Sequence, residues 1–220
     1  MPQKMTCDDL RLRLSAAAIY SDEHFAAFLL NSDPLSGKLT ATEQREIITG
    51  ALHCGVEVAR ELGGRFAAVS PTELACRLGV KIVAGDLRSA RLVLSTYDPH
   101  TTTVTLNKAL IEKVEQCQCS QTLLPRNFNL TEITVAHELF HHVESGNKGI
   151  FSRQFKVTLW RFGPLRFPST VSAAGEIAAT VCAKTLCGLC FNPVLLEAVA
   201  LYMEDKPRMT GWFDRLDRAG

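Results

Sequence analysis

The sequence has little of what marks a membrane-bound or exported protein. Its longest apolar stretch near the C-terminus runs only from Thr185 to Leu196 and contains Gly188 and Pro193, whereas a helix that crosses a bilayer needs about 20 apolar residues. The first residues are charged and have no apolar core, so we expect no signal peptide. These features predict a protein without a membrane partner.

An excess of charge of either sign is also missing. The 220 residues include 24 Lys and Arg against 23 Asp and Glu, for a net charge of +1. This balance gives no overall electrostatic attraction to nucleic acid or membranes, and we predict no direct DNA binding. Hydrophobic residues make up 46% and charged residues 21% of the chain, which excludes wholesale disorder, collagen-like and coiled-coil chains.

Cysteine is the one residue type that could suggest an exported scaffold. The chain has eight cysteines, but a chain of this length without an export signal is expected to keep free thiols in a reducing cytosol. We therefore expect a cytoplasmic protein. The spacing of Cys187 and Cys190 is also that of redox or metal sites, but their apolar helical surroundings favour buried structural thiols.

The first part of the chain reads as helix. Apolar residues recur at roughly helical spacing over the first 30 residues, and a turn cluster follows at residues 31–37. We therefore separate an N-terminal helical extension, residues 1–39, from a main domain, residues 40–220. Thr40 and Glu43 form a capping-box pattern at the start of the next helix.

A change to extended structure follows a short helix at Pro71–Leu78. Three runs rich in Val, Ile, Thr and Leu read as strands, namely Val80–Val83, Arg91–Tyr97 and Thr102–Asn107. The Asp98-Pro99-His100 turn joins the last two as a hairpin. The sequence therefore predicts a small three-stranded antiparallel sheet.

Helical patterns return in the second half of the chain. They cover Leu130–Ser145 and Ser172–Cys190, and a third begins at Asn192-Pro193 and ends near Asp205. The predicted fold class is therefore α+β and mostly helical.

The motif that carries chemistry is H-E-x-x-H, inside the helix predicted at Leu130–Ser145. His137 and His141 lie one turn apart, so both imidazoles project from one face and suit two ligands of a tetrahedral Zn²⁺. Glu138 lies beside them, where it can take a proton from a water at the metal. The alternative is that both histidines are polar residues on a half-exposed helix face.

A catalytic zinc site needs a third protein ligand. Glu144 follows His141 by three residues, but backbone geometry makes it a poor ligand for the same metal. Asn147 stands where another zinc-protease class has its third histidine, so that class is excluded. Glu176 lies on the next long helix among small residues that allow close packing, which makes it the best candidate.

Two segments around these residues resemble the ImmA/IrrE-type metallopeptidases, gluzincin-like enzymes with a glutamate as third zinc ligand. The first segment is Val135-Ala136-His137-Glu138-Leu139, followed by His141-His142. The second begins at Glu176, continues with Ala179, Ala183 and Leu186, and ends in Phe191-Asn192-Pro193. With a weaker upstream similarity, the resemblance covers roughly residues 42 to 203.

The resemblance implies a gluzincin-like core with Zn²⁺ on His137, His141 and Glu176, and Glu138 as general base. It also implies a protein or peptide substrate, typically a transcriptional repressor cleaved within the cell. Two other functions stay open: a non-catalytic regulatory or partner-binding protein that retains the fold, and a metal-dependent hydrolase of a non-peptide substrate.

The segment between the two metal-bearing helices is basic and aromatic. From Ser145 to Gly175 there is no Asp or Glu. The basic residues of this segment are Lys148, Arg153, Lys156, Arg161 and Arg166. It can border the cleft and steer an acidic stretch of the substrate, or it can be a connector with solvated charges. Tyr97 and His100, near the hairpin turn, are either oxyanion donors or ordinary turn residues.

Overall fold

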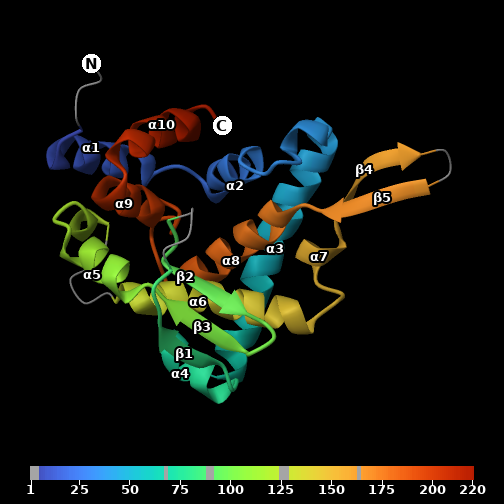
Figure 1. The fold of residues 1–220 in the computed structure, drawn as a ribbon, viewed down its shortest axis with the longest axis horizontal. Helices are drawn as coiled ribbons and strands as arrows, with labels where there is room; N and C mark the ends of the chain where they lie inside the picture. Colours follow the sequence, from blue (N-terminus) through green and yellow to red (C-terminus); the bar gives the residue numbers. More distant parts are fainter. Residues whose placement is uncertain (1–4, 67–68, 88–91, 124–128, 163–164) are drawn as a thin grey trace.

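Helices make up most of the protein in a computed structural model, which describes all residues except 1–4, 67–68, 88–91, 124–128 and 163–164 (Figure 1). The α-helices are α1 (Cys7–Ala17), α2 (Asp22–Asn31), α3 (Ala41–Arg65), α4 (Pro71–Arg77), α5 (Lys108–Gln116), α6 (Leu130–Gly146), α7 (Phe151–Gln154), α8 (Ser172–Leu186), α9 (Leu195–Glu204) and α10 (Lys206–Asp217). Two 3-10 turns are η1 (Ser36–Lys38) and η2 (Ser120–Thr122). The strands are β1 (Lys81–Ala84), β2 (Ser95–Asp98), β3 (Thr103–Leu106), β4 (Lys156–Phe162) and β5 (Leu165–Thr170).

Side-chain caps fix where several of these helices begin. Thr40 and Glu43 form the predicted capping box at the start of α3. Ser70 caps α4, which has Pro71 in its first turn. Asn129 caps α6 by accepting a hydrogen bond from the Thr131 backbone N–H at 2.8 Å. Because these signals are local, the starts of the three helices can be predicted from the sequence to within a residue or two.

The sheet is mixed, so the prediction of an antiparallel sheet is wrong. Its strand order is β1-β3-β2. β2 and β3 pair antiparallel as the predicted hairpin, but β1 pairs parallel with β3. β2 takes the outer position and β3 turns back between the two, so β3 runs in the same direction as β1. The prediction of an α+β, mostly helical fold is confirmed.

A second, two-stranded sheet occupies the segment that the sequence analysis left without secondary structure. β4 and β5 pair antiparallel, with a register irregularity between Thr158 and Trp160. The ribbon extends away from the rest of the molecule beside α7 and the start of α8 (Figure 1). A two-stranded ribbon has little stability of its own. The β4–β5 ribbon therefore depends on its connections to α7 and α8 to stay folded.

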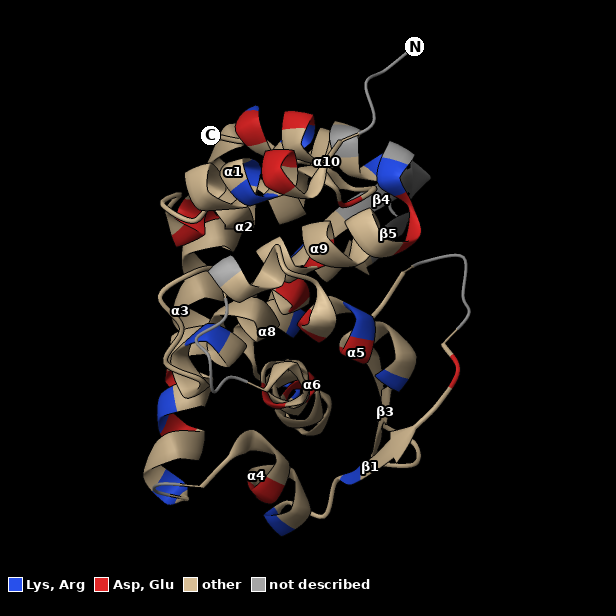
Figure 2. Cartoon of the chain, turned by 90° about the vertical axis from the view of Figure 1, so that its left-hand side faces the viewer, with Lys and Arg blue, Asp and Glu red and all other residues tan. Residues whose placement is uncertain are grey.

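Helix α6 lies at the centre of the molecule. Figure 2 shows it end-on, with α8, α5, α4 and the sheet around it. The same view shows Lys and Arg interspersed with Asp and Glu. Helix α8 packs against both α6 and α3. Its close approach to α3 depends on Gly55, because a Cβ there would collide with the carbonyl oxygen of Ala178.

The N-terminal helices are part of the same hydrophobic core. Leu10 and Leu14 of α1 and Phe25 of α2 are almost fully buried and belong to the cluster that includes α6 and α8. Asp33, which is 6% exposed, accepts hydrogen bonds from the Ser172 hydroxyl and the Ala173 N–H at the start of α8. The described residues of the N-terminal extension, 5–39, therefore help to position the helix that carries Glu176.

Two expectations about cysteines need correction. Cys7 and Cys119 are joined by a disulfide, so they are not free thiols. The bond links the first residue of α1 to the residue before η2. The predicted helix over Ser172–Cys190 ends earlier, at Leu186, since Gly188 adopts a positive φ of 61°. Cys190 is therefore outside the helix and exposed, not buried.

None of the described helices is both long and apolar enough to cross a membrane.

Candidate metal centre

Helix α6 presents both histidines of the motif on one face. The rings of His137 and His141 meet edge to face with their centroids 5.1 Å apart. Each is partly exposed, with 25% and 20% of the side chain accessible. Leu139, on the opposite side of α6, is fully buried, and so is Phe140, whose ring meets that of His141 edge to face with centroids 5.8 Å apart, so core packing fixes the orientation of the histidine face.

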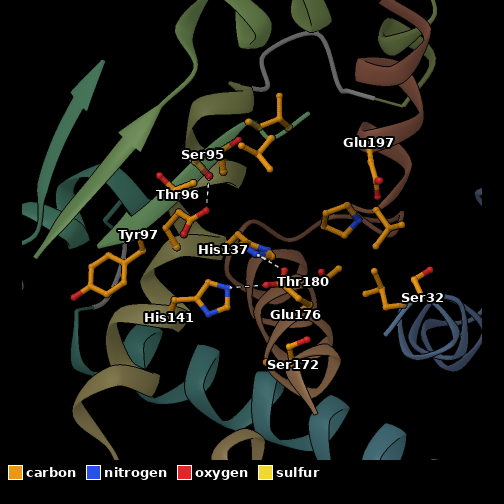
Figure 3. A pocket seen from close by; sticks show the side chains of 18 of the residues that line it. Ser32, Ser95, Thr96, Tyr97, His137, His141, Ser172, Glu176, Thr180 and Glu197 are labelled. Carbon is orange, nitrogen blue, oxygen red and sulfur yellow. Dashed lines mark hydrogen bonds and ion pairs between the residues drawn. The ribbon is translucent and has the colours of Figure 1, made fainter. Parts of the chain in front are cut away.

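Glu176 comes to these histidines from α8. Its carboxylate oxygens lie 3.4 Å from His137 Nε2 and 3.7 Å from His141 Nε2. Figure 3 shows the three side chains converging on one point between the two helices. The ligand atoms of the triad all lie within 4.8 Å of one another.

The spacing of the triad fits a metal ion. Zinc bonds of about 2.0–2.1 Å at tetrahedral angles place neighbouring ligand atoms about 3.3–3.4 Å apart, close to the separations that Glu176 makes with both histidines. His137, His141 and Glu176 therefore form a group that could hold a metal ion. The sequence named these residues, and the fold brings all three together.

Glu144 acts on His141 from the side away from the triad. His141 Nδ1 and Glu144 Oε2 are 3.0 Å apart, and the Ser152 hydroxyl donates to the other oxygen of Glu144. The carboxylate fits there because Gly175 has no side chain, since a Cβ would lie 2.9 Å from Glu144 Oε1. Glu144, which the sequence analysis weighed as a third ligand, thus fixes the tautomer that leaves His141 Nε2 free.

Replacing Glu144 by glutamine is expected to lower metal affinity about tenfold to a hundredfold, because the partner that orients His141 and raises its basicity is weakened. Competition with a zinc-sensitive chelator measures the affinity. The Glu112→Gln variant, which changes an exposed residue of α5, should bind metal like the parent. Equal affinity in Glu144→Gln and the parent would contradict the orienting role.

The triad lies in a negative electrostatic environment. Burial lowers the pKa of His141, but the hydrogen bond to Glu144 and the neighbouring carboxylates outweigh burial and raise the pKa to about 9. Burial also works against the ionised form of Glu144, yet the bonds from His141 and Ser152 hold its pKa below the ordinary value. The raised pKa of His141 indicates that this site favours a positive charge, which a proton or a metal ion can supply.

Glu138 is placed beside the triad and held by the sheet. Its residue is 5% exposed, and its Oε1 accepts a hydrogen bond from the hydroxyl of Ser95, the first residue of β2. Sequence analysis missed Ser95, because the contact joins positions 43 residues apart and a lone serine has no motif. The bond couples the end strand of the sheet to the motif helix.

A large cavity of about 1290 Å³ opens over the triad. One side is formed by Ser95, Thr96 and Tyr97 of β2, the end strand of the three-stranded sheet. The floor includes the triad and Glu138, and the far side is built from α2, α9 and α10. The size and position suit a bound chain segment and not only a small molecule.

The hydroxyl of Tyr97 is already engaged. It lies 2.9 Å from Nδ1 of His142, and Figure 3 shows it directed away from His137. His142 itself lies outside the triad, and burial lowers its pKa. His100 is exposed in the hairpin turn, so neither Tyr97 nor His100 is placed as an oxyanion donor.

The basic segment reaches the rim of the cavity. Arg153, Lys156 and Thr170 are among the lining residues. The Arg153 guanidinium donates to the carbonyl oxygens of Glu144 and Ser145 at the end of α6, at 3.2 and 3.1 Å, so its charge stabilises that helix terminus. Lys156 is exposed at the base of β4. The side chains of Arg161 and Arg166 lie outside the described part of the chain.

Comparisons with known proteins found no relative: no family model matches the chain, and neither a search of curated proteins nor one of solved structures gave a match. The similarity to the ImmA/IrrE-type metallopeptidases stays a prediction from the sequence.

Proposed function

We propose that the protein is a zinc-dependent endopeptidase with a gluzincin-like core, of the ImmA/IrrE type. The observation that carries the proposal is the convergence of His137, His141 and Glu176 from two helices beside Glu138, at the floor of a large cavity. A structural role for the two histidines would not require an exposed carboxylate from a second helix to meet them, nor an open cavity above them.

The residues around the triad have distinct roles in this proposal. A zinc ion held by the triad would supply Lewis-acid polarisation of the scissile carbonyl and make water more acidic. Glu138 takes a proton from the attacking water and passes it to the nitrogen of the leaving amine. Ser95 binds Oε1 of Glu138, so the carboxylate is held in place and Oε2 is the oxygen that carries the proton.

The sheet supplies a place for the substrate backbone. β2 is an end strand and borders the cavity, so an extended peptide can add to its open edge by main-chain hydrogen bonds. This arrangement favours a peptide over a compact non-peptide substrate. The resemblance suggests an intracellular protein such as a transcriptional regulator as the natural substrate.

Incubation of the zinc-loaded protein with a mixed peptide library tests the proposed activity. We expect cleavage at internal peptide bonds, detected by mass spectrometry, and its loss when a chelator removes the metal. A protein that binds zinc and peptides but cleaves none of them would instead be the non-catalytic partner-binding protein.

The basic segment gives a prediction about substrate capture. Reversing Lys156, Arg161 and Arg166 to glutamate is expected to raise KM for a protein substrate with an acidic stretch about tenfold or more, with zinc content unchanged, because these charges attract that stretch to the rim. In the parent, cleavage efficiency should fall as salt rises, since exposed charges act over only about 10 Å at 0.1 M ionic strength. Steady-state kinetics at several salt concentrations measures both effects.

A matched control reverses three exposed cations away from the cavity, Lys81, Lys108 and Arg218, and should leave KM unchanged. Arg153 is left intact, because it supports the end of α6. Salt-independent turnover together with parental kinetics in the Lys156, Arg161 and Arg166 variant would make the ribbon a mere connector.

A further inference from the structure

The end strand β2 is joined to the motif helix α6 by two side-chain contacts. The hydroxyl of Ser95 donates a hydrogen bond to Glu138 Oε1. The hydroxyl of Tyr97 lies 2.9 Å from His142 Nδ1, and the two rings meet edge to face with their centroids 5.7 Å apart. The four side chains are partly or fully buried. The sheet is therefore bound to the helix that carries the motif by specific polar contacts as well as by packing.

The spacing of the two contacts matches between strand and helix. Ser95 and Tyr97 lie on the same face of β2, about 6.6 Å apart along the strand. Glu138 and His142 are four residues apart, about 6.0 Å along the axis of α6. The strand thus runs beside the helix in the same direction. Together the two contacts fix which part of β2 lies beside which turn of α6.

The main chain of the same two residues is directed at the outer edge of the sheet. The Asn107 N–H donates to the Leu94 carbonyl oxygen at 2.8 Å, in continuation of the antiparallel register of β2 and β3. Every second residue of such a pair bonds to its partner, so Thr96 turns its N–H and C=O toward β3. Ser95 and Tyr97 turn theirs to the other side, where the described part of the chain places no neighbouring strand.

This outer edge borders the cavity over the triad. Residues 92–97 all line the cavity, and Figure 3 shows Ser95, Thr96 and Tyr97 in succession beside His137 and His141. An extended peptide that adds to β2 would therefore form its main-chain hydrogen bonds with Ser95 and Tyr97. These are the residues whose side chains contact α6.

We propose that Ser95 and Tyr97 position the substrate relative to the metal centre, by binding its main chain while their side chains hold β2 against Glu138 and His142. An end strand has a neighbouring strand on one side only, and a substrate that had to order it would bind less tightly. The two side-chain contacts remove that cost before the substrate arrives. The inference rests on the proposed function, because it takes an extended peptide as the substrate.

The test compares two zinc-binding probes on the zinc-loaded full chain. Acetohydroxamate binds zinc through its hydroxamate alone, whereas acetyl-trialanine hydroxamate adds a short main chain that can pair with β2. In spectra of ¹⁵N-labelled protein, we expect the longer probe to slow hydrogen exchange of the Ser95 and Tyr97 amides at least about tenfold. Acetohydroxamate should leave both rates unchanged. The Thr96 amide, which faces β3, should exchange slowly with and without either probe.

Two substitutions remove the side-chain contacts and keep the main chain. Ser95→Ala loses the bond to Glu138, and Tyr97→Phe loses the contact with His142. Each should reduce the ratio of the two probe affinities, longer over shorter, about fivefold to tenfold. Ser95→Thr, which restores a hydroxyl, should recover the parental ratio. The matched control Thr96→Val removes an exposed hydroxyl from the same strand and should not change it.

Kinetics on a cleaved peptide separates the two contacts. Ser95→Ala should lower kcat about tenfold or more, because Glu138 loses the partner that orients it. Tyr97→Phe should raise KM and leave kcat nearly unchanged, since it does not contact the base. A purely structural role of either residue would lower thermal stability but would keep the parental ratio of probe affinities.

The outcomes distinguish this inference from the proposed function. If the amides of Ser95 and Tyr97 are not protected by the longer probe, or if both variants keep the parental ratio, the inference is wrong even where peptides are cleaved. If protection and the loss of ratio are found but no peptide is cleaved, the positioning role stands and the peptidase assignment fails. If acetohydroxamate does not bind, the metal centre fails and this inference fails with it.

Discussion

The Glu138→Gln variant is expected to bind zinc as the parent does and to lose peptide hydrolysis by about a hundredfold to ten-thousandfold. The substitution keeps the shape of the side chain and its acceptor for the Ser95 hydroxyl, but removes the base that takes the water proton. Because Glu138 does not belong to the triad, metal affinity should not change. Initial rates on a cleaved peptide and zinc content, measured on the same preparation, give both quantities.

The control for this variant is Glu112→Gln, the same substitution at an exposed position of α5. It should show parental hydrolysis and parental zinc content. If Glu138→Gln lost its zinc as completely as a ligand variant, Glu138 would be a ligand and the assignment of roles would be wrong. Hydrolysis at the parental rate would show that another group acts as the base.

Alanine at His137, His141 or Glu176 is expected to lower zinc affinity more than about a hundredfold in each case. Each substitution removes one of three protein ligands, a larger loss than that of an orienting partner, which costs about tenfold to a hundredfold. Equilibrium dialysis against a zinc buffer measures the affinity. His100→Ala, which removes an exposed histidine from the hairpin turn, should have no effect.

The three ligand variants also test the triad against its alternatives. If Glu176→Ala bound zinc like the parent, the third ligand would lie elsewhere, and Glu144 would be the next candidate because it already contacts His141. Loss of affinity in the histidine variants alone would keep the motif but remove α8 from the site.

Local signals made much of the site predictable. The H-E-x-x-H spacing and the Asn129 cap both act within one helix, so the sequence alone places His137 and His141 on one face of α6, with Glu138 on the neighbouring side. Glu176 could be predicted because small residues around it indicate close helix packing. In the structure, Gly175 lets α8 approach Glu144 of α6, and Gly55 lets α3 approach Ala178 of α8.

Contacts between distant segments were not predictable in the same way. Ser95 reaches Glu138, Asp33 caps α8, and Glu197 lines the cavity only because separate elements meet. The parallel pairing of β1 with β3 likewise depends on which strand takes the outer position. Neither the composition nor the periodicity of a strand encodes that order.

Some elements were missed although the sequence carries a signal for them. Helix α10 was not predicted, yet Met209, Trp212, Phe213 and Leu216 recur at helical spacing and are all buried. Helix α5 was also missed, although Asn107 caps it and its apolar residues face the core. Helix α5 begins two residues after β3 ends, and α10 begins two residues after α9 ends. No turn-rich segment separates either helix from the element before it, so the sequence pattern does not show where the helix begins.

The measurement that tests the account most directly is the zinc content of the purified full chain. The protein is incubated with excess zinc, dialysed against zinc-free buffer and analysed for metal, beside a variant in which His137 and His141 are both alanine. The account predicts about one zinc per chain in the parent and none in the double variant. A parent that retains no zinc after this treatment, or a double variant that retains as much as the parent, would contradict a metal centre at His137, His141 and Glu176.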